Sequence, residues 1–167
     1  MSLKKWVYGM LPLACIIIIF LFSATPYQEQ DIKPMLASHI DLSPLEPLLA
    51  PIQFTYAGNE ISVQAVGVYS FVEFTLRKVA HFGIYFCLAI LAFAALYKGF
   101  GMKYRLSLRI ALVISILYAC LDEFHQGMTP GRTPYIGDVV IDTIGACVGL
   151  LVVIIGRNLY HIYWKRL

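Results

Sequence analysis

Four long runs of apolar residues dominate the chain, and polar or mixed segments separate them. The runs occupy residues 3–22, 79–97, 106–121 and 139–156. A helix of about 20 apolar residues crosses the apolar core of a bilayer, so each run is long enough once the shorter ones are extended at their ends. The pattern predicts an all-α membrane protein whose four transmembrane helices cover about 3–22, 71–97, 106–126 and 138–158.

The composition excludes a water-soluble domain. Of the 167 residues, 59% are hydrophobic and only 14% are charged, whereas soluble domains average about 25% charged residues. The length suits one domain over 1–167. We expect the first run to stay attached as a helix, because cleavage after Ala24 would place the large Phe22 where a signal peptide needs a small residue. Binding of nucleic acid is not expected, since the net charge of +3 comes from scattered basic residues.

Charged residues segregate to the two sides of the four predicted spans. The basic residues on the side of the two termini are Lys4, Lys5, Lys98, Lys103, Arg105, Arg109, Arg157, Lys165 and Arg166. All 10 acidic residues fall on the other side. Short cytoplasmic loops collect lysine and arginine, so both termini are predicted to be cytoplasmic. The long segment 23–70 and the loop 122–138 are then predicted to face outward.

The outward segment carries two local patterns. Five prolines interrupt 26–51, which predicts short helical turns near the outer interface. The stretches 52–56 and 60–64 alternate apolar and polar residues, as half-buried strands do. Between them Gly58 and Asn59 are suited to positive φ angles, so a small β-hairpin is predicted.

The second membrane helix is predicted to begin above the bilayer. Ser70 and Glu73 have the spacing of a capping box, which places the first turn near Phe71. One face of this helix is polar over about 100°. The residues on that face are Arg77, Lys78, His81 and Tyr85.

Three groups of polar residues meet the outward membrane boundary in this topology. They are Lys78, His81 and Tyr85 on the second helix, Asp122, Glu123, His125 and Gln126 at the end of the third, and Arg132, Asp138 and Asp142 around the start of the fourth. Ionisable residues within a span are costly unless they have partners, and they usually face a bundle interior or a cavity. We therefore predict that the three groups form one site.

The residue types suggest specific roles within this site. His125 is a candidate general acid or base that Asp122 or Glu123 would orient, and His81 is a further catalytic candidate. Lys78 and Arg132 could hold a phosphate or pyrophosphate, arginine in bidentate fashion. The remaining candidates for contact with a substrate are Gln126, Tyr85, Asp138 and Asp142.

Three other interpretations compete with these roles. The histidines and carboxylates could bind a divalent metal, although their spacing matches no standard ligand motif. The charges could instead form a buried network that only ties the helices together, and Asp138 suits the first turn of a helix in any case. Below them, Gly145 and Gly149 have the spacing that lets membrane helices approach closely, within the chain or in a homodimer.

Four short motifs run through the three groups in a fixed order. They are RKVAHFGIY at 77–85, DEFHQ at 122–126, PGR at 130–132 and DVVIDTIG at 138–145. In order, spacing and residue type they resemble the signatures of the VanZ-like family of bacterial membrane proteins, over roughly 6–155. Ile84 departs from the family pattern, which has a glutamate or a similar residue there, so no acid–base role is expected at that position.

The resemblance implies a multi-pass protein of the bacterial inner membrane, with the candidate residues as its site. The founding member of the family gives low-level resistance to the glycopeptide teicoplanin, but the resemblance implies no reaction. Three hypotheses follow. The protein could be an outer-leaflet hydrolase or transferase acting on a phospholipid or lipid-linked envelope precursor. It could instead be a non-catalytic module that binds an envelope lipid or a lipoglycopeptide. A small transporter is less favoured, because no inverted repeat is visible.

The predicted topology can be tested by labelling single cysteines. In a variant without the native cysteines, Gly131→Cys should react with a membrane-impermeant thiol reagent added to intact cells, because its loop faces outward. Gly101→Cys should react only after the cells are opened. The reverse labelling pattern would invert the topology.

Overall fold

The computed structural model describes residues 3–164, with side chains from Lys5 to His161. Lys165 and Arg166, and the side chain of Lys4, contribute to the charge count but lie outside the described residues. Four of its helices are long and apolar enough to cross a membrane. They are α1 (Leu3–Ala24), α5 (Val68–Ala94), α6 (Tyr104–Gln126) and α7 (Ile136–Trp164). The predicted number and order of transmembrane helices are confirmed.

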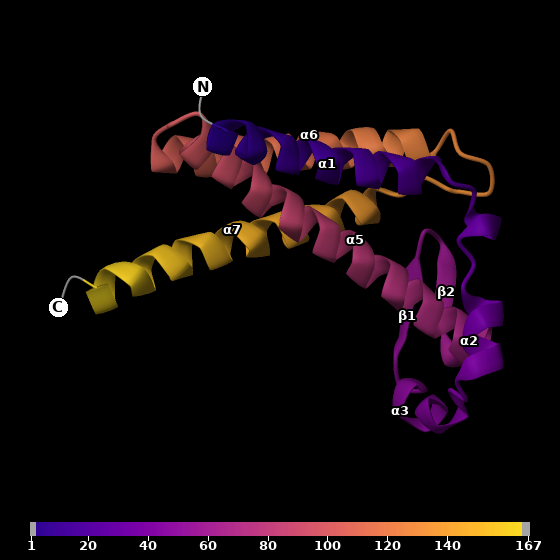
Figure 1. Ribbon diagram of the computed structural model, residues 1–167. Helices are drawn as coiled ribbons and strands as arrows, with labels where there is room; N and C mark the ends of the chain where they lie inside the picture. The colour runs from indigo at the N-terminus through magenta and orange to yellow at the C-terminus, as the bar shows by residue number, and fades with distance from the viewer. Residues whose placement is uncertain (1–2, 165–167) are drawn as a thin grey trace.

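The four helices pack into one bundle (Figure 1). Helices α1 and α6 run side by side, and α5 lies against α1, α6 and α7. After α5 a π-helical turn, η3 (Ala95–Gly99), leads toward α6. The start of α1 and the end of α7 lie at the same end of the bundle, as an even number of crossings requires.

Glycines set the close packing of α5 against α7. A Cβ atom at Gly145 would clash with the backbone of Phe82, and one at Gly149 would clash with the backbone of Phe86. Small residues allow this approach in membranes, where association depends on packing and polar contacts and not on burial from water. The spacing of these two glycines therefore serves a contact within the chain.

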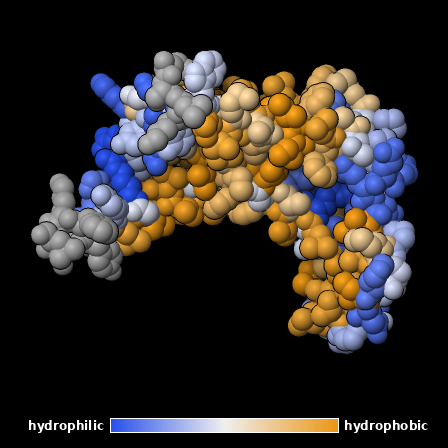
Figure 2. Space-filling model, viewed as in Figure 1, coloured by the Kyte–Doolittle hydropathy of each residue, from blue (hydrophilic) through white to orange (hydrophobic). Residues whose placement is uncertain are grey.

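Most large apolar side chains point out of the bundle and not into it. Figure 2 shows them as an apolar band between two polar ends. Inside the bundle, alanines such as Ala89, Ala111 and Ala146 form much of the packing, while Tyr85 and Leu88 are the largest apolar side chains that are fully buried. This arrangement suits a protein whose surroundings are lipid chains.

The segment between α1 and α5, predicted to face outward, consists of short elements, as the prolines predict. They are η1 (Tyr27–Glu29), α2 (Lys33–His39), η2 (Ser43–Leu45), α3 (Glu46–Leu49), β1 (Gln53–Tyr56), β2 (Asn59–Ser62) and α4 (Val63–Val66). Strands β1 and β2 pair antiparallel, so the predicted hairpin is confirmed. The large exposed apolar side chains of the segment include Met35, Ile40, Leu48 and Ile52.

The turn of the hairpin differs in detail from the prediction. Tyr56 pairs with Asn59, which leaves Ala57 and Gly58 as the two turn residues. Their φ angles are 49° and 81°, because a tight two-residue hairpin turn requires positive φ at both positions. Asn59 belongs to the strand and does not take a positive φ angle.

The predicted capping box of the second membrane helix is wrong. Helix α5 begins at Val68, directly after Gly67 at a φ of 80°, and no side chain caps it. Ser62 is the serine that caps a helix, accepting a hydrogen bond of 3.1 Å from the Ala65 amide in α4. Glu73 is not available as a cap because its carboxylate pairs with Arg77 one turn further along.

The glycine contact predicts opposite effects of the same substitution at two positions. Gly145→Ala should lower the melting temperature in detergent, because overpacking costs about 1–3 kcal/mol. Gly156→Ala is the control, since nothing lies within 4 Å of a Cβ there. It should be neutral or stabilising by up to about 1 kcal/mol, because alanine favours helix. Unchanged melting of Gly145→Ala, together with loss of a dimer on size exclusion, would contradict the internal role.

Candidate functional site

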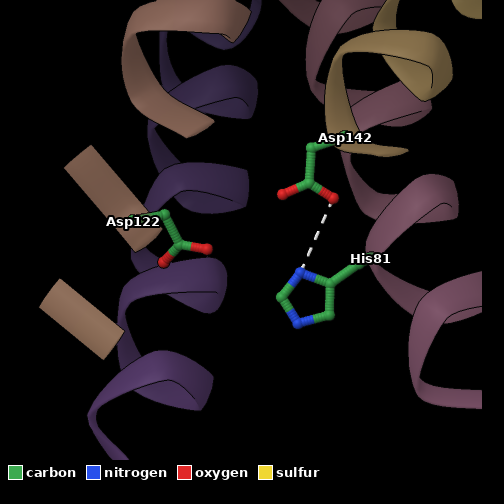
Figure 3. A group of neighbouring side chains, drawn as sticks. All are labelled: His81, Asp122 and Asp142. Atoms are coloured by element: carbon green, nitrogen blue, oxygen red, sulfur yellow. Dashed lines mark ion pairs between the residues drawn. The ribbon is translucent and has the colours of Figure 1, made fainter. Parts of the chain in front are cut away.

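Helices α5, α6 and α7 bring three ionisable side chains together at the end of the bundle nearer the hairpin. His81 comes from α5, Asp122 from α6 and Asp142 from α7 (Figure 3). The Nδ1 atom of His81 lies 3.6 Å from Oδ1 of Asp142. One ligand atom from each of the three residues lies within 4.8 Å of the others. One residue from each of the three predicted groups therefore lies in this cluster.

Both carboxylates in this group are buried, and one is firmly held. Asp122 and Asp142 are only 3% and 2% exposed. Asp122 accepts hydrogen bonds from the Ser23 hydroxyl at 2.5 Å and from the Gln126 amide at 3.0 Å. The bond from Ser23 connects α6 to the end of α1. Tyr85 is fully buried in the field of both carboxylates, and its hydroxyl has no hydrogen bond within the described residues.

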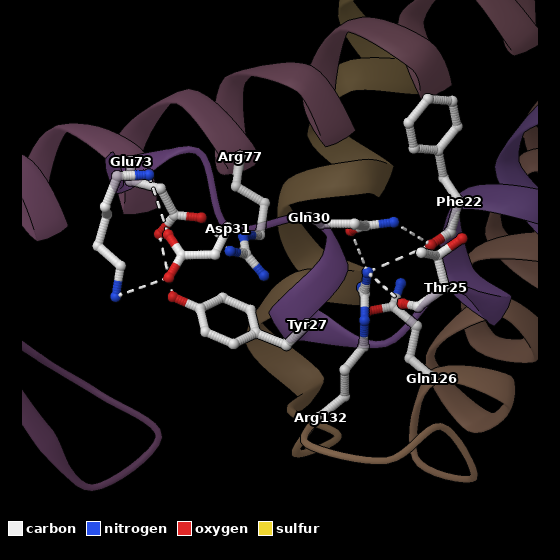
Figure 4. A network of polar contacts seen from close by, with 10 residues as sticks. Phe22, Thr25, Tyr27, Gln30, Asp31, Glu73, Arg77, Gln126 and Arg132 are labelled. Carbon is white, nitrogen blue, oxygen red and sulfur yellow. Dashed lines mark hydrogen bonds and ion pairs between the residues drawn. The ribbon is translucent and has the colours of Figure 1, made fainter. Parts of the chain in front are cut away.

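Arg132 is bound by neutral acceptors only (Figure 4). The acceptors are Gln126 Oε1 at 3.0 Å, the carbonyls of Phe22 at 3.2 Å and Thr25 at 3.3 Å, and Gln30 Oε1. Its Nε atom has no partner, and no carboxylate pairs with it, within the residues that the structure describes. Burial, followed by the nearby Arg77, lowers the pKa of Arg132. Its positive charge therefore has no direct counter-ion among the described residues.

Arg77 stands near Arg132 but has its own carboxylate. It pairs with Glu73 on α5, and its guanidinium lies 4.3 Å from the centre of the Tyr27 ring. The Tyr27 hydroxyl in turn donates to Glu73 at 3.5 Å. Helix α5 thereby fixes the first turn of the outward segment beside the Arg132 network (Figure 4).

A cavity of about 560 Å³ lies between α1 and α5 and adjoins both arrangements. Its apolar walls are Ile18, Ile19, Phe22, Ile32, Leu76, Ala80 and Ile84. Its polar lining is Ser23, Glu29, Gln30, Glu73, Arg77, His81 and Arg132. The cavity is therefore amphipathic, with the two arginines, His81 and apolar side chains around one space.

Lys78 does not share this cavity with Arg132, contrary to the predicted pair of phosphate-binding cations. It pairs with Asp138, which also accepts a hydrogen bond from the Tyr56 hydroxyl. Successive residues of a helix point about 100° apart, so Lys78 faces α7 and the hairpin while Arg77 faces the cavity. Burial and the Asp138 carboxylate raise the pKa of Tyr56. Lys78 and Asp138 thus tie the hairpin to the start of α7.

The expected pairing of His125 with a carboxylate is not formed. The His125 ring stacks on Phe20 of α1, with 4.5 Å between ring centres, and its Nδ1 atom has no hydrogen bond within the described residues. Glu123 accepts from the Tyr135 amide at 2.5 Å. A separation of three residues turns His125 about 60° away from Asp122 around the helix. His81 is the histidine that lies next to buried carboxylates.

Sequence reasoning missed several residues that build the site. Ser23 and Gln30 are single polar residues beyond the first apolar run, and no pattern connects them to α6 or to Arg132. Tyr27 resembles any interfacial tyrosine. Glu73 carried a signal that pointed to a different role, as a cap. Arg77 was visible on the polar face of the second helix, but its adjacency to Arg132 depends on the helix packing.

Comparison with known proteins supports the resemblance seen in the motifs. The sequence profile of the VanZ/LLP1 family matches residues 8–157, which include all four motifs and the core of each membrane helix. Neither the curated proteins nor the solved structures contain a significant match. The family match extends over most of the chain, and the chain therefore belongs to the VanZ/LLP1 family.

Proposed function

We propose that the protein binds a membrane lipid with a phosphate-bearing headgroup in the cavity between α1 and α5. The observation that carries this proposal is Arg132, a half-buried guanidinium without a carboxylate partner among the described residues. Arginine binds phosphate through paired, charge-assisted hydrogen bonds. An anionic headgroup would supply the missing counter-ion and would lie near Arg77 as well.

The walls of the cavity favour a lipid over a soluble phosphate. Ile18 and Ile19 on α1 and Ile84 on α5 belong to helices apolar enough to span the membrane. A chain that leaves the headgroup can therefore run along these side chains into the bilayer. About 560 Å³ lies in the usual range of small-molecule pockets, roughly 300–1,000 Å³. It accommodates a headgroup and the first part of a chain.

The segregated charges and the family support a location for this activity. Lysines and arginines cluster on the side of the termini, which favours cytoplasmic termini and supports a position of the cavity at the outer leaflet of a bacterial inner membrane. Membership of the VanZ/LLP1 family suggests an association with the cell envelope and antibiotic resistance. A phospholipid or lipid-linked envelope precursor is the ligand that fits both this location and the association with the cell envelope. We treat 1–167 as a single functional domain.

The proposal predicts selective loss of binding on removal of one charge. Purified wild-type protein should bind phosphatidic acid and should bind diacylglycerol, which lacks the phosphate, far more weakly. Arg132→Gln should weaken binding of phosphatidic acid about 10–100-fold, because hydrogen bonds to charged groups contribute roughly 1.5–3 kcal/mol. Native mass spectrometry of lipid-titrated samples measures the affinity of each protein for each lipid.

A matched control separates this effect from general loss of charge. Arg109→Gln makes the same substitution at an exposed position near the other end of α6 and should leave lipid binding unchanged. Equal weakening by the two variants, or equal binding of the phosphate-bearing and phosphate-free lipids by wild type, would refute a specific headgroup site.

One observation favours a reaction at the bound headgroup as a second candidate function. His81 lines the cavity, and its ring lies 3.6 Å from the buried Asp142. A histidine that a carboxylate orients is a common general base. This assigns to His81 the role that the sequence suggested for His125, and it makes the protein an outer-leaflet hydrolase or transferase.

Binding alone and reaction can be separated with His81→Asn. Under the second candidate this variant should bind phosphatidic acid like wild type but lose whatever envelope phenotype the intact protein confers on cells, such as tolerance to a glycopeptide. His39→Asn, on an exposed turn of the outward segment, is the control and should keep both properties. Full tolerance with His81→Asn would leave only the binding function, whereas loss with His125→Asn alone would return the role to His125.

A further inference from the structure

We propose that His81, Asp122 and Asp142 bind one divalent metal ion of the zinc class, a function beyond lipid binding and independent of it. The three side chains come from three helices, α5, α6 and α7 (Figure 3). One imidazole nitrogen and two carboxylate oxygens are a ligand set that zinc accepts. Because the ligands are far apart in sequence, no short motif of metal ligands reveals the site.

The distances suit a shared metal better than a direct hydrogen bond. Nδ1 of His81 and Oδ1 of Asp142 are 3.6 Å apart. Two ligand atoms about 2.1 Å from a tetrahedral zinc ion are separated by about 3.4 Å, whereas N–H···O hydrogen bonds are about 2.7–3.2 Å long. The ligand atoms of all three residues already lie within 4.8 Å of one another. Side-chain movements of the order of 1 Å would therefore bring the three ligand atoms to the separations found around one zinc ion.

Buried polar atoms without a hydrogen bond point to a ligand at this place. Asp142 is 2% exposed, and its Oδ1 atom has no hydrogen-bond partner within the described residues. The Nδ1 atom of His81, which faces this oxygen at 3.6 Å, and the hydroxyl of Tyr85 are buried and likewise have no hydrogen bond there. Buried polar groups are nearly always satisfied. A metal ion would satisfy the carboxylate and the imidazole at once.

The two buried carboxylates also favour a cation at this place. When both are ionised, Asp122 and Asp142 place two negative charges in a buried position. Lys78 pairs with Asp138 and Arg77 with Glu73. The hydrogen bonds of Arg132 go to neutral oxygens and not to Asp122 or Asp142. A divalent ion with a neutral histidine balances the two carboxylates. A protonated histidine supplies one charge only, which makes the proton the competitor to be tested.

The surroundings of Asp122 resemble those of a metal-bound carboxylate. Its two oxygens accept hydrogen bonds from Ser23 and Gln126, and each keeps a free lone pair for a metal. Such supporting hydrogen bonds orient ligands and tune metal affinity. Ser23 and His81 also line the cavity. The site therefore lies at the cavity wall, where three protein ligands leave a coordination position for water or for an oxygen of a bound molecule.

Metal binding should be measured on the full chain in detergent, after metal removal and titration with Zn²⁺ or Co²⁺. We expect wild type to bind one equivalent, with a cobalt absorption spectrum of nitrogen and oxygen coordination. Asp142→Asn and His81→Ala should lose this binding. Asp138→Asn makes the same substitution one helical turn before Asp142 and should keep it. Equal zinc content in Asp142→Asn and Asp138→Asn would overturn the proposal.

Two further measurements keep the proposal testable if the ligand variants fail to fold. Ser23→Ala removes only a supporting hydrogen bond and should weaken zinc binding about 10–100-fold. Removing zinc from wild type with a chelator should lower its melting temperature, since a ligand that binds the folded state stabilises it. If wild type holds no stoichiometric metal and the chelator does not change its melting temperature, the metal proposal is refuted. A shared proton would then link His81 to the carboxylates.

The metal and the lipid proposals fail separately. Arg132→Gln should lose binding of phosphatidic acid and keep one equivalent of zinc. Loss of both properties in this variant would show that the metal does not bind independently of the arginine network, and would overturn the metal site as proposed. Binding of zinc without any lipid binding by wild type would refute the lipid proposal alone.

Discussion

The contact between α5 and α7 is the constraint on which the site depends. At Gly145 the backbone of Phe82 lies directly against α7, and at Gly149 that of Phe86 does the same. His81 precedes Phe82, and Asp142 lies one turn before Gly145, so the same approach brings their side chains together. A larger residue at either glycine would separate the helices and the two side chains with them. The same two glycines therefore determine both the packing of α5 against α7 and the closeness of His81 to Asp142.

Polar contacts do for the rest of the bundle what apolar burial does in a soluble protein. Lipid chains are as apolar as leucine, so burial of leucine alone holds membrane helices together weakly. In this chain Ser23 connects α1 to Asp122, and Arg132 connects the loop after α6 to the carbonyls of Phe22 and Thr25. The end of the bundle near the hairpin is thus joined by hydrogen bonds, while alanines and glycines pack its middle.

Features that depend on residues close together in the sequence could be predicted from it. Run lengths and the alternation around Gly58 gave the four spans and the hairpin, because both depend on residues close in sequence. The common membrane depth of the polar groups followed from span positions. Which polar residues meet depends on how each helix is rotated, and neighbours differ by about 100°. For that reason Arg77 and not Lys78 lies with Arg132, and Asp122 and not His125 faces His81.

The bonds from Asp138 to Lys78 and Tyr56 have a consequence for the order of biosynthesis. Tyr56 belongs to a hairpin that leaves the ribosome early, whereas Asp138 belongs to the last helix, 82 positions later. The hairpin can complete its contacts only after α7 has been made and inserted. Ser23 likewise waits for Asp122, 99 positions further on. The segment between α1 and α5 is therefore made before its partners exist, and insertion of the final helix is the event that fixes it in place.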